Sequence, residues 1–194
     1  YKKNAKKTFT FLITCNINKK SFYRISSVID AFNDLFYENK NICLKIAGNI
    51  EHGSTILNRI KILKLENNVS FIKSYKQIDA PKIYGEADAY ITMSYQDNCP
   101  SAVIEAMSCG LPILYSSSGG TPELVDKDSG IGLKVKESWQ KIQVPLKSEI
   151  KDGMINIIDH NKEMSEAART RAVEYFDIKN WIKKHDEIFQ KFLK

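Results

Sequence analysis

The sequence lacks the features of several protein classes. No apolar run approaches the roughly 20 residues needed to cross a bilayer, and no signal peptide is present. The four cysteines (Cys15, Cys43, Cys99 and Cys109) form no C-x-x-C pair, and no histidine stands near them at metal-ligand spacing. We therefore expect free thiols in a reducing compartment, a cytoplasmic location and no bound metal.

The sequence also has no internal repeat and no low-complexity linker, so its 194 residues predict a single domain. A content of 43% hydrophobic and 27% charged residues argues against disorder. The net charge of +6 comes from scattered lysines, and no aromatic residues interleave with a basic run, so we expect no nucleic-acid groove. We interpret the lysines as solvated, with anionic lipid headgroups as the alternative partner. Because Tyr1 stands where an initiator Met would, we expect the chain to be part of a longer protein.

Short apolar runs typical of strands alternate with amphipathic stretches typical of helices. We expect strands over 8–15, 42–47, 69–72, 89–93, 112–115 and 130–135, and helices over 22–36, 56–65, 80–85 and 101–108. Several of these strands are apolar throughout, as strands buried on both faces are. The pattern predicts a Rossmann-like α/β fold: a doubly wound parallel sheet of about six strands with helices on both faces.

From about residue 145 the pattern becomes purely helical, with Asp177 as a plausible N-cap of the last helix. We therefore divide the domain into an α/β core of about 8–145 and a helical tail of about 146–194. In doubly wound sheets, ligands bind outside the carboxyl ends of the strands, where the winding reverses. The loops that follow the strands are thus the places to search for a site.

The most informative stretch runs from Ser94 to Glu123. Pro100 stands where the first residue of a helix is expected, and Gly110 stands where that helix should end. The free amides of such a helix start can bind an anion such as a diphosphate. Glu105, inside the helix, can face the same crevice and accept hydrogen bonds from sugar hydroxyls.

The next loop, 116–120, ends in paired glycines, Gly119 and Gly120, which permit close backbone approach. Each of these features is weak when taken alone, because an isolated Gly-Gly is usually a turn and a lone helical Glu is usually solvated. Their order within about thirty residues makes the signal strong.

This stretch resembles the signature of retaining GT-B glycosyltransferases, particularly glycosyltransferase family four (glycosyl transferases group 1). The matching residues are Ser94, Asp97, Glu105, Ala106, Met107, Gly110, Pro112, Gly119, Gly120 and Glu123. The segments 46–49, 68–71, 84–94 and 176–181 resemble the family too, so the likeness covers nearly the whole chain. It implies the C-terminal donor-binding domain of a two-domain enzyme whose N-terminal acceptor domain is absent from this chain.

The resemblance also implies a function: transfer of a hexosyl group from a nucleotide diphosphate-sugar to a glycan or lipid-linked acceptor, with retention and without a metal or other cofactor. By carry-over, Glu105 binds the ribose and Asp97 faces the donor sugar and its phosphate. The other implied donor-binding residues are Lys73, Ser74 and Tyr75 at the base, Asn98, Cys99, Pro100, Ser101 and Ala102 at the diphosphate, and Gly119 and Gly120. Glu123 supports its loop.

The sequence departs from the family pattern in three places. The expected Arg and Lys after the first strand have no clean match, so Lys19, Lys20 and Arg24 compete to stabilise the leaving diphosphate. We favour Lys20 because it is close to the strand end. Asp97 stands where Glu is commoner, which shortens its reach by one methylene, and Cys99-Pro100 replaces the usual Phe-Gly.

Two other functions remain open from the sequence. A nucleotide-sugar epimerase of GT-B architecture would need acid–base histidines, but His52, His160 and His185 all lie outside the signature. A non-catalytic nucleotide-binding module would need no catalytic residues. By analogy with many family members, we expect a role in surface polysaccharide synthesis, with possible peripheral contact at the inner face of the membrane, while the fragment alone should be inactive.

Overall fold

Six parallel strands form one sheet in the order β3-β2-β1-β4-β5-β6. The computed structural model describes residues 8–18, 21–49 and 53–193. The strands are β1 (Phe9–Thr14), β2 (Ile42–Ala47), β3 (Val69–Ile72), β4 (Ala89–Thr92), β5 (Ile113–Ser117) and β6 (Gly130–Lys134). The chain winds outward from β1 to β3 and then returns to β4 beside β1. The winding therefore reverses between β1 and β4, as predicted for a doubly wound sheet.

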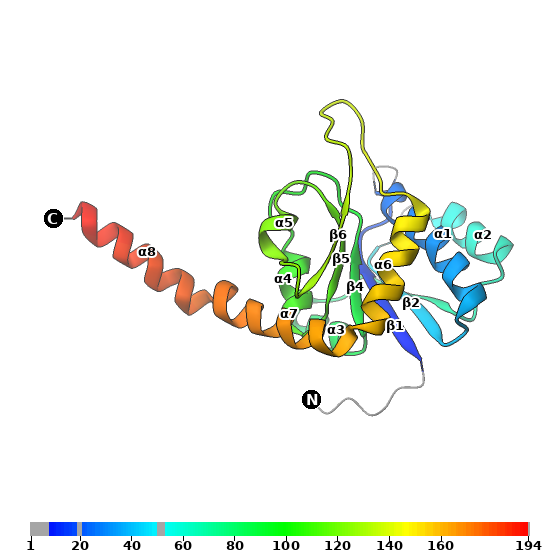
Figure 1. Cartoon of the computed structure of the whole chain (residues 1–194), viewed down its shortest axis with the longest axis horizontal. Coiled ribbons are helices and arrows are strands. Elements are labelled where there is room, and N and C mark those ends of the chain that lie inside the picture. Colours follow the sequence, from blue (N-terminus) through cyan, green and yellow to red (C-terminus); the bar gives the residue numbers. More distant parts are fainter. Residues whose placement is uncertain (1–7, 19–20, 50–52, 194) are drawn as a thin grey trace.

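Helices cover both faces of the sheet (Figure 1). One face carries α1 (Phe22–Glu38), α2 (Gly53–Ile62) and α6 (Lys147–Asp159). The other carries α3 (Ala80–Gly85), α4 (Ser101–Ser108) and α7 (Asn161–Phe176), with the short α5 (Thr121–Leu124) after β5. This arrangement confirms the predicted fold class.

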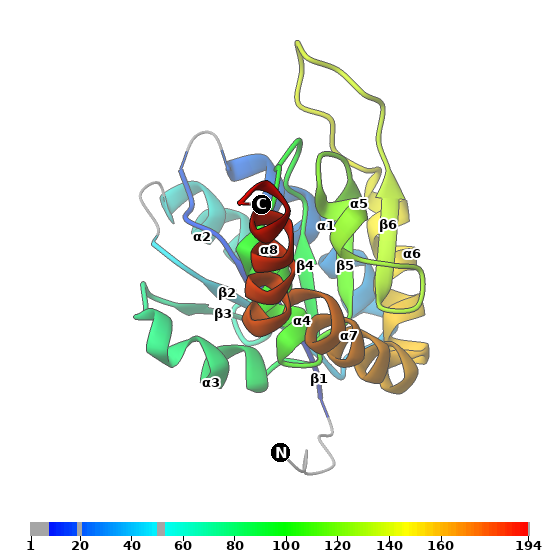
Figure 2. The same cartoon turned by 90° about the vertical axis from the view of Figure 1, so that its left-hand side faces the viewer.

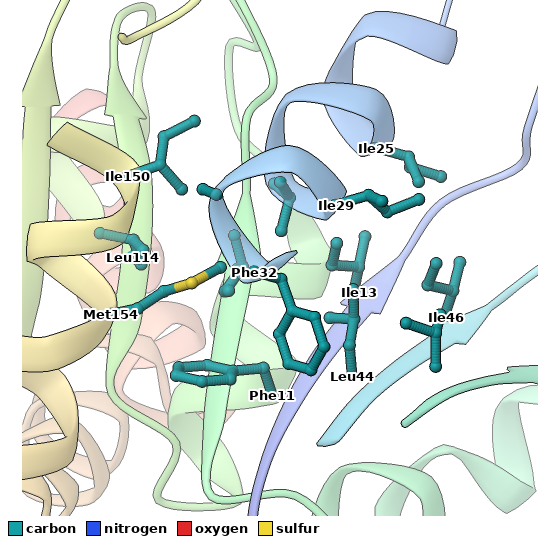
Figure 3. Packing of buried hydrophobic residues seen from close by; sticks show 14 of the residues in the cluster. Phe11, Ile13, Ile25, Ile29, Phe32, Leu44, Ile46, Leu114, Ile150 and Met154 are labelled. Atoms are coloured by element: carbon teal, nitrogen blue, oxygen red, sulfur yellow. The ribbon is translucent and has the colours of Figure 1, made fainter. Parts of the chain in front are cut away.

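The larger core lies between the sheet and the helices α1 and α6 (Figure 3). Phe32 and Ile29 of α1 pack over Phe11 and Ile13 of β1, and Met154 of α6 closes the cluster. All five side chains are buried. Burial of each such side chain contributes about 1.5–3 kcal/mol, so this cluster fixes the position of β1, whose end opens toward the site.

The structure refines several predicted boundaries. β5 continues through Ser117, so Ser116 belongs to a strand and not to the following loop. A 3-10 turn, η1 (Gln77–Asp79), and helix α5 were not predicted, because segments this short carry no hydrophobic period. The predicted Asp177 cap is confirmed, since the Lys179 amide donates to the Asp177 carboxylate at 2.7 Å.

The last helix, α8 (Ile178–Phe192), projects away from the sheet (Figures 1 and 2). Its large apolar side chains are mostly open to solvent: Trp181 is 55% exposed and Phe189 is 61% exposed. Among the described residues, no helix is long and apolar enough to span a membrane.

Candidate functional site

Helix α4 begins at the carboxyl edge of the sheet, directly after the loop that follows β4. Pro100 is the N-cap, with ψ of 101°, and not the first helical residue as predicted. Its extended backbone suits a cap, because the residue before the helix normally lies outside the helical region. No side chain caps the helix start, and Asn98, Cys99 and Ser101 are exposed. Gly110 ends the segment at a φ of +74°, as predicted.

The paired glycines bring the loop after β5 against the loop after β4. The Gly120 amide donates to the Asp97 carbonyl at 2.8 Å. A Cβ on Gly119 would lie 2.4 Å from the Asp97 carbonyl oxygen, and Gly119 has a φ of +62°. Both positions therefore require glycine. The expected close backbone approach is present, and its partner is the backbone around Asp97.

Side chains join the same two loops. The Gln96 amide donates to the Ser118 hydroxyl at 3.1 Å, and that hydroxyl donates to the Ser94 carbonyl at 3.4 Å. Gln96 itself has a φ of +53°, which is uncommon outside glycine. The two loops thus form one backbone unit that holds Asp97 at the carboxyl edge.

Glu105 faces this edge from the second turn of α4. It is half-buried, and its Oε2 accepts a hydrogen bond from the Tyr84 hydroxyl at 3.1 Å. Tyr84 also lies 3.5 Å from the hydroxyl of Thr14, the last residue of β1. Glu105 is therefore turned toward the point where the winding reverses, as the sequence predicted.

The loop after β3 contributes Tyr75 to the same place. Loss of water raises the pKa of the half-buried Tyr75 hydroxyl, and the nearby Glu105 carboxylate raises it further. Lys73 and Ser74, the other two residues predicted to contact the base, are exposed in this loop. Four loops, after β1, β3, β4 and β5, thus converge at one edge.

A cation also lies at this edge. Arg24, in the first turns of α1, is half-buried, and its guanidinium Nε donates to the Tyr23 hydroxyl at 3.2 Å. Burial lowers the Arg24 pKa, but the interactions with Tyr23, through the hydrogen bond and through charge, outweigh burial together with smaller contributions from Cys15 and Asp97, so the Arg24 pKa is raised. The favoured Lys20 and its rival Lys19 lie outside the described residues.

Glu123 is exposed on α5, and its carboxylate makes no hydrogen bond or ion pair within the described chain. The loop is instead supported by Arg171 of α7, which donates to the carbonyls of Glu123 and Leu124 and pairs with Asp126 at 3.0 Å. The support that the sequence assigned to the Glu123 side chain comes, among the described residues, from Arg171.

The segment between β6 and α6, which rises above the carboxyl edge, was not predicted to belong to the site (Figure 1). Tyr95 anchors it: its hydroxyl accepts from the Ser138 amide at 2.7 Å and donates to the Ser138 carbonyl at 2.9 Å. Trp139, next in the chain, is 94% exposed. Only the aromatic residue directly after Ser94 could have suggested this contact.

A cavity of about 320 Å³ lies elsewhere, toward the amino ends of β1, β2 and β3. Its lining consists of Thr8, Thr10, Cys43, Lys45, Asn67, Asn68 and Ser70. None of these residues belongs to the predicted site. We place the site at the carboxyl edge, because the charged groups and the glycine-dependent loops converge there.

The cysteines and histidines of the described chain form no metal site or disulfide. In residues 8–18, 21–49 and 53–193, no cluster of three or more His, Cys, Asp or Glu side chains could hold a metal. All four cysteines are free, as predicted. His160 bonds back to Asn156 and His185 stacks on Trp181, while His52 lies outside the described residues.

The chain is similar to known proteins in sequence and in fold. A sequence relative is N-acetyl-alpha-D-glucosaminyl L-malate synthase of Bacillus anthracis, 26% identical over 182 residues, which are 91% of this chain and 44% of the relative. Among solved structures, Anabaena Alr3699/HepE in complex with UDP-glucose has a TM-score of 0.75 at 18% identity, over 95% of this chain and 49% of that one. The pneumococcal O-GlcNAc transferase GtfA in complex with UDP and GlcNAc has a TM-score of 0.77 at 18% identity, over 97% and 36%.

The chain spans less than half the length of these three proteins. The two structures show that its fold is that of GT-B glycosyltransferases. The family model described as glycosyl transferases group 1 matches residues 2–171, which is most of the chain. The chain therefore belongs to the glycosyl transferases group 1 family.

Proposed function

We propose that this chain is the donor-binding domain of a retaining glycosyltransferase that takes a hexosyl group from a nucleotide diphosphate-sugar. The observation that carries the proposal is the convergence of Glu105, Asp97 and the glycine-paired loop at the edge between β1 and β4. Ligands of doubly wound sheets bind at such a reversal. Two solved relatives hold UDP or UDP-glucose, so we propose uridine diphosphate sugars as the first donors to test.

In this proposal each loop has one task. Glu105 accepts hydrogen bonds from the ribose hydroxyls, and the loop with Lys73, Ser74 and Tyr75 lies along the base. The uncapped start of α4, from Asn98 to Ala102, binds the diphosphate through backbone amides and the helix dipole. Asp97 faces the donor sugar.

The chemical step needs stabilisation of the negative charge that develops on the leaving diphosphate. We propose that Arg24 supplies part of it, because its half-buried guanidinium donates to the Tyr23 hydroxyl, which accepts from the Tyr95 amide in the loop that carries Asp97. Lys20 and Lys19 remain candidates for the same task. We propose that the reaction uses no metal ion or other cofactor, as in the families whose signature the chain resembles.

The acceptor must bind across the edge from the donor. Since the matched region is less than half of each relative's own length, we propose that a second domain, N-terminal in the whole protein, binds a glycan or lipid-linked acceptor. The isolated chain then binds donors without transferring sugar. We propose a cytoplasmic enzyme of surface polysaccharide synthesis, whose peripheral contact with the inner face of the membrane would use the exposed lysines.

Isothermal titration calorimetry tests the donor site directly. We expect this chain to bind UDP and UDP-glucose, or GDP and a GDP-sugar, at up to millimolar concentration. Glu105→Ala should weaken binding about tenfold, which corresponds to loss of one hydrogen bond to a charged group. Glu123→Ala, which removes an exposed carboxylate from the neighbouring loop, is the matched control. Absence of binding to all four ligands would refute the donor site.

A further inference from the structure

Tyr84 is buried beneath the site, yet its hydroxyl reaches the Glu105 carboxylate. The ring is 1% exposed, and the hydroxyl donates to Glu105 Oε2 at 3.1 Å. Tyr84 lies at the end of α3, 21 residues before Glu105, so the contact joins two elements on the same face of the sheet. Among the described residues, no other side chain donates a hydrogen bond to this carboxylate.

Burial keeps the Tyr84 hydroxyl a donor. Loss of water raises its pKa far above the ordinary value for tyrosine, and the neighbouring Tyr90, Tyr75 and Glu105 raise it further. The Tyr84 hydroxyl therefore stays protonated at neutral pH and can donate to the Glu105 carboxylate.

A second buried hydroxyl supports the first. Tyr90 of β4 is buried, its hydroxyl lies 2.7 Å from the Thr14 hydroxyl, and its ring lies 5.8 Å from the Tyr84 ring between centroids. One arrangement that satisfies these contacts has Tyr90 donating to Thr14, Thr14 to Tyr84 and Tyr84 to Glu105, with the Tyr75 hydroxyl beside Tyr84 and Thr14. Such a network fixes the Tyr84 hydroxyl in place, since each member holds the next.

Only one of the two carboxylate oxygens is used in this way. Glu105 Oε2 is held by Tyr84, while Oε1 accepts no hydrogen bond in the described chain. A glutamate has three rotatable bonds, and a ligand must otherwise meet the entropy of ordering them. We propose that Tyr84 is a positioning residue: it holds Oε2 so that Oε1 meets a vicinal diol of the ligand.

The diol consists of the 2′ and 3′ hydroxyls of the nucleotide's ribose, and this identification rests on the proposed function. The chain should therefore bind a ribonucleotide more tightly than an analogue that lacks the two ribose hydroxyls. Tyr84 itself touches no ligand in this account. Its effect should appear in that preference, and not in affinity for the base or the diphosphate.

The test compares binding of UDP and 2′,3′-dideoxy-UDP to this chain by calorimetry. The unmodified chain should bind UDP more tightly, and Glu105→Ala should abolish the preference. Tyr84→Phe, which removes one oxygen, should reduce the preference about tenfold while leaving the affinity for the dideoxy analogue unchanged. Because unfolded protein binds neither ligand, the ratio of the two dissociation constants does not depend on the fraction folded.

Tyr115→Phe is the matched control. Tyr115 is a buried tyrosine of the same core whose hydroxyl lies 3.5 Å from the Val125 carbonyl and does not contact Glu105. It should leave the preference intact. If Tyr84→Phe leaves the preference intact while Glu105→Ala abolishes it, the positioning role is wrong and the donor site stands. If Glu105→Ala keeps the preference, the proposed ribose contact itself fails.

Discussion

Gly120 packs against Asn98 so closely that a Cβ on the glycine would lie 1.8 Å from the Asn98 carbonyl oxygen. The obstacle is backbone, so it cannot turn aside as a flexible side chain can. Gly120→Ala must push apart the two loops that hold Asp97. We expect donor affinity to fall by about tenfold or more, measured by calorimetry, because overpacking of this kind costs about 1–3 kcal/mol.

Gly85→Ala provides the matched control for this experiment. A Cβ at Gly85 meets no atom within 4 Å, and the residue lies at the end of α3 without a positive φ. We expect unchanged binding and equal or slightly higher stability, since alanine lowers the entropy of the unfolded chain. Equal losses in both variants would show that the effect at Gly120 is not caused by the close approach.

Arg24 should contribute to the affinity for the diphosphate part of a nucleotide and not to the affinity for the nucleoside. Loss of one charge-assisted hydrogen bond in Arg24→Gln should weaken UDP binding about tenfold and leave the binding of uridine unchanged. Arg59→Gln is the control, because Arg59 pairs with Asp30 on the outer surface. Unchanged UDP affinity in Arg24→Gln would transfer the proposed role to Lys19 or Lys20.

The strand positions and the site loops were predictable from sequence for a physical reason. The segments 42–47 and 69–72 are short runs that are mostly apolar, with one polar residue each (Lys45 and Ser70), and each run is followed by glycine or a polar residue, so both strands were predicted to the residue. The glycine pair was predictable because only glycine allows backbone contact. Its partner, the backbone of Asp97 and Asn98, was not, because a contact across 22 residues leaves no local pattern.

No pattern in the sequence indicated the long-range side-chain contacts either. Tyr84 and Tyr90 fall within the predicted helix 80–85 and the predicted strand 89–93, and no local pattern shows that their hydroxyls lie in the network under Glu105. Helix α8 was predictable as a helix, but a helical pattern does not show what covers its apolar residues, and Trp181 and Phe189 stay exposed.

Arg171 should be important for the stability of the chain. Its guanidinium satisfies the carbonyls of Glu123 and Leu124 at the end of α5 and pairs with Asp126. We expect Arg171→Ala to lower the free energy of unfolding by about 1–3 kcal/mol in urea titrations, because it leaves backbone carbonyls without a donor. Arg171→Lys should be intermediate, since lysine lacks the planar fork. A loss below about 0.5 kcal/mol in Arg171→Ala would contradict this role.

We expect the free energy of unfolding to fall in acid because of the Asp126 carboxyl, which lies in the same region. Partial burial raises the pKa of its carboxyl, but donors from Ser129, the Arg171 charge and the Asp128 amide lower it more, so the folded pKa lies below the ordinary value of 3.8. A carboxyl with a lowered folded pKa stabilises the protein above its unfolded pKa, and the stabilisation disappears as pH falls through the folded pKa.

The free energy of unfolding should therefore be higher for the unmodified chain than for Asp126→Asn at pH 7 and pH 5. The difference should shrink as pH falls from about 4 toward the folded pKa, because the protonated carboxyl no longer attracts Arg171. Urea titrations at pH 7, 5, 4 and 3 measure it. Asp128→Asn, at an exposed aspartate whose carboxylate makes no hydrogen bond in the described chain, is the control. A difference that stays constant from pH 7 to pH 3 would show that Asp126 acts through its shape and not through its charge.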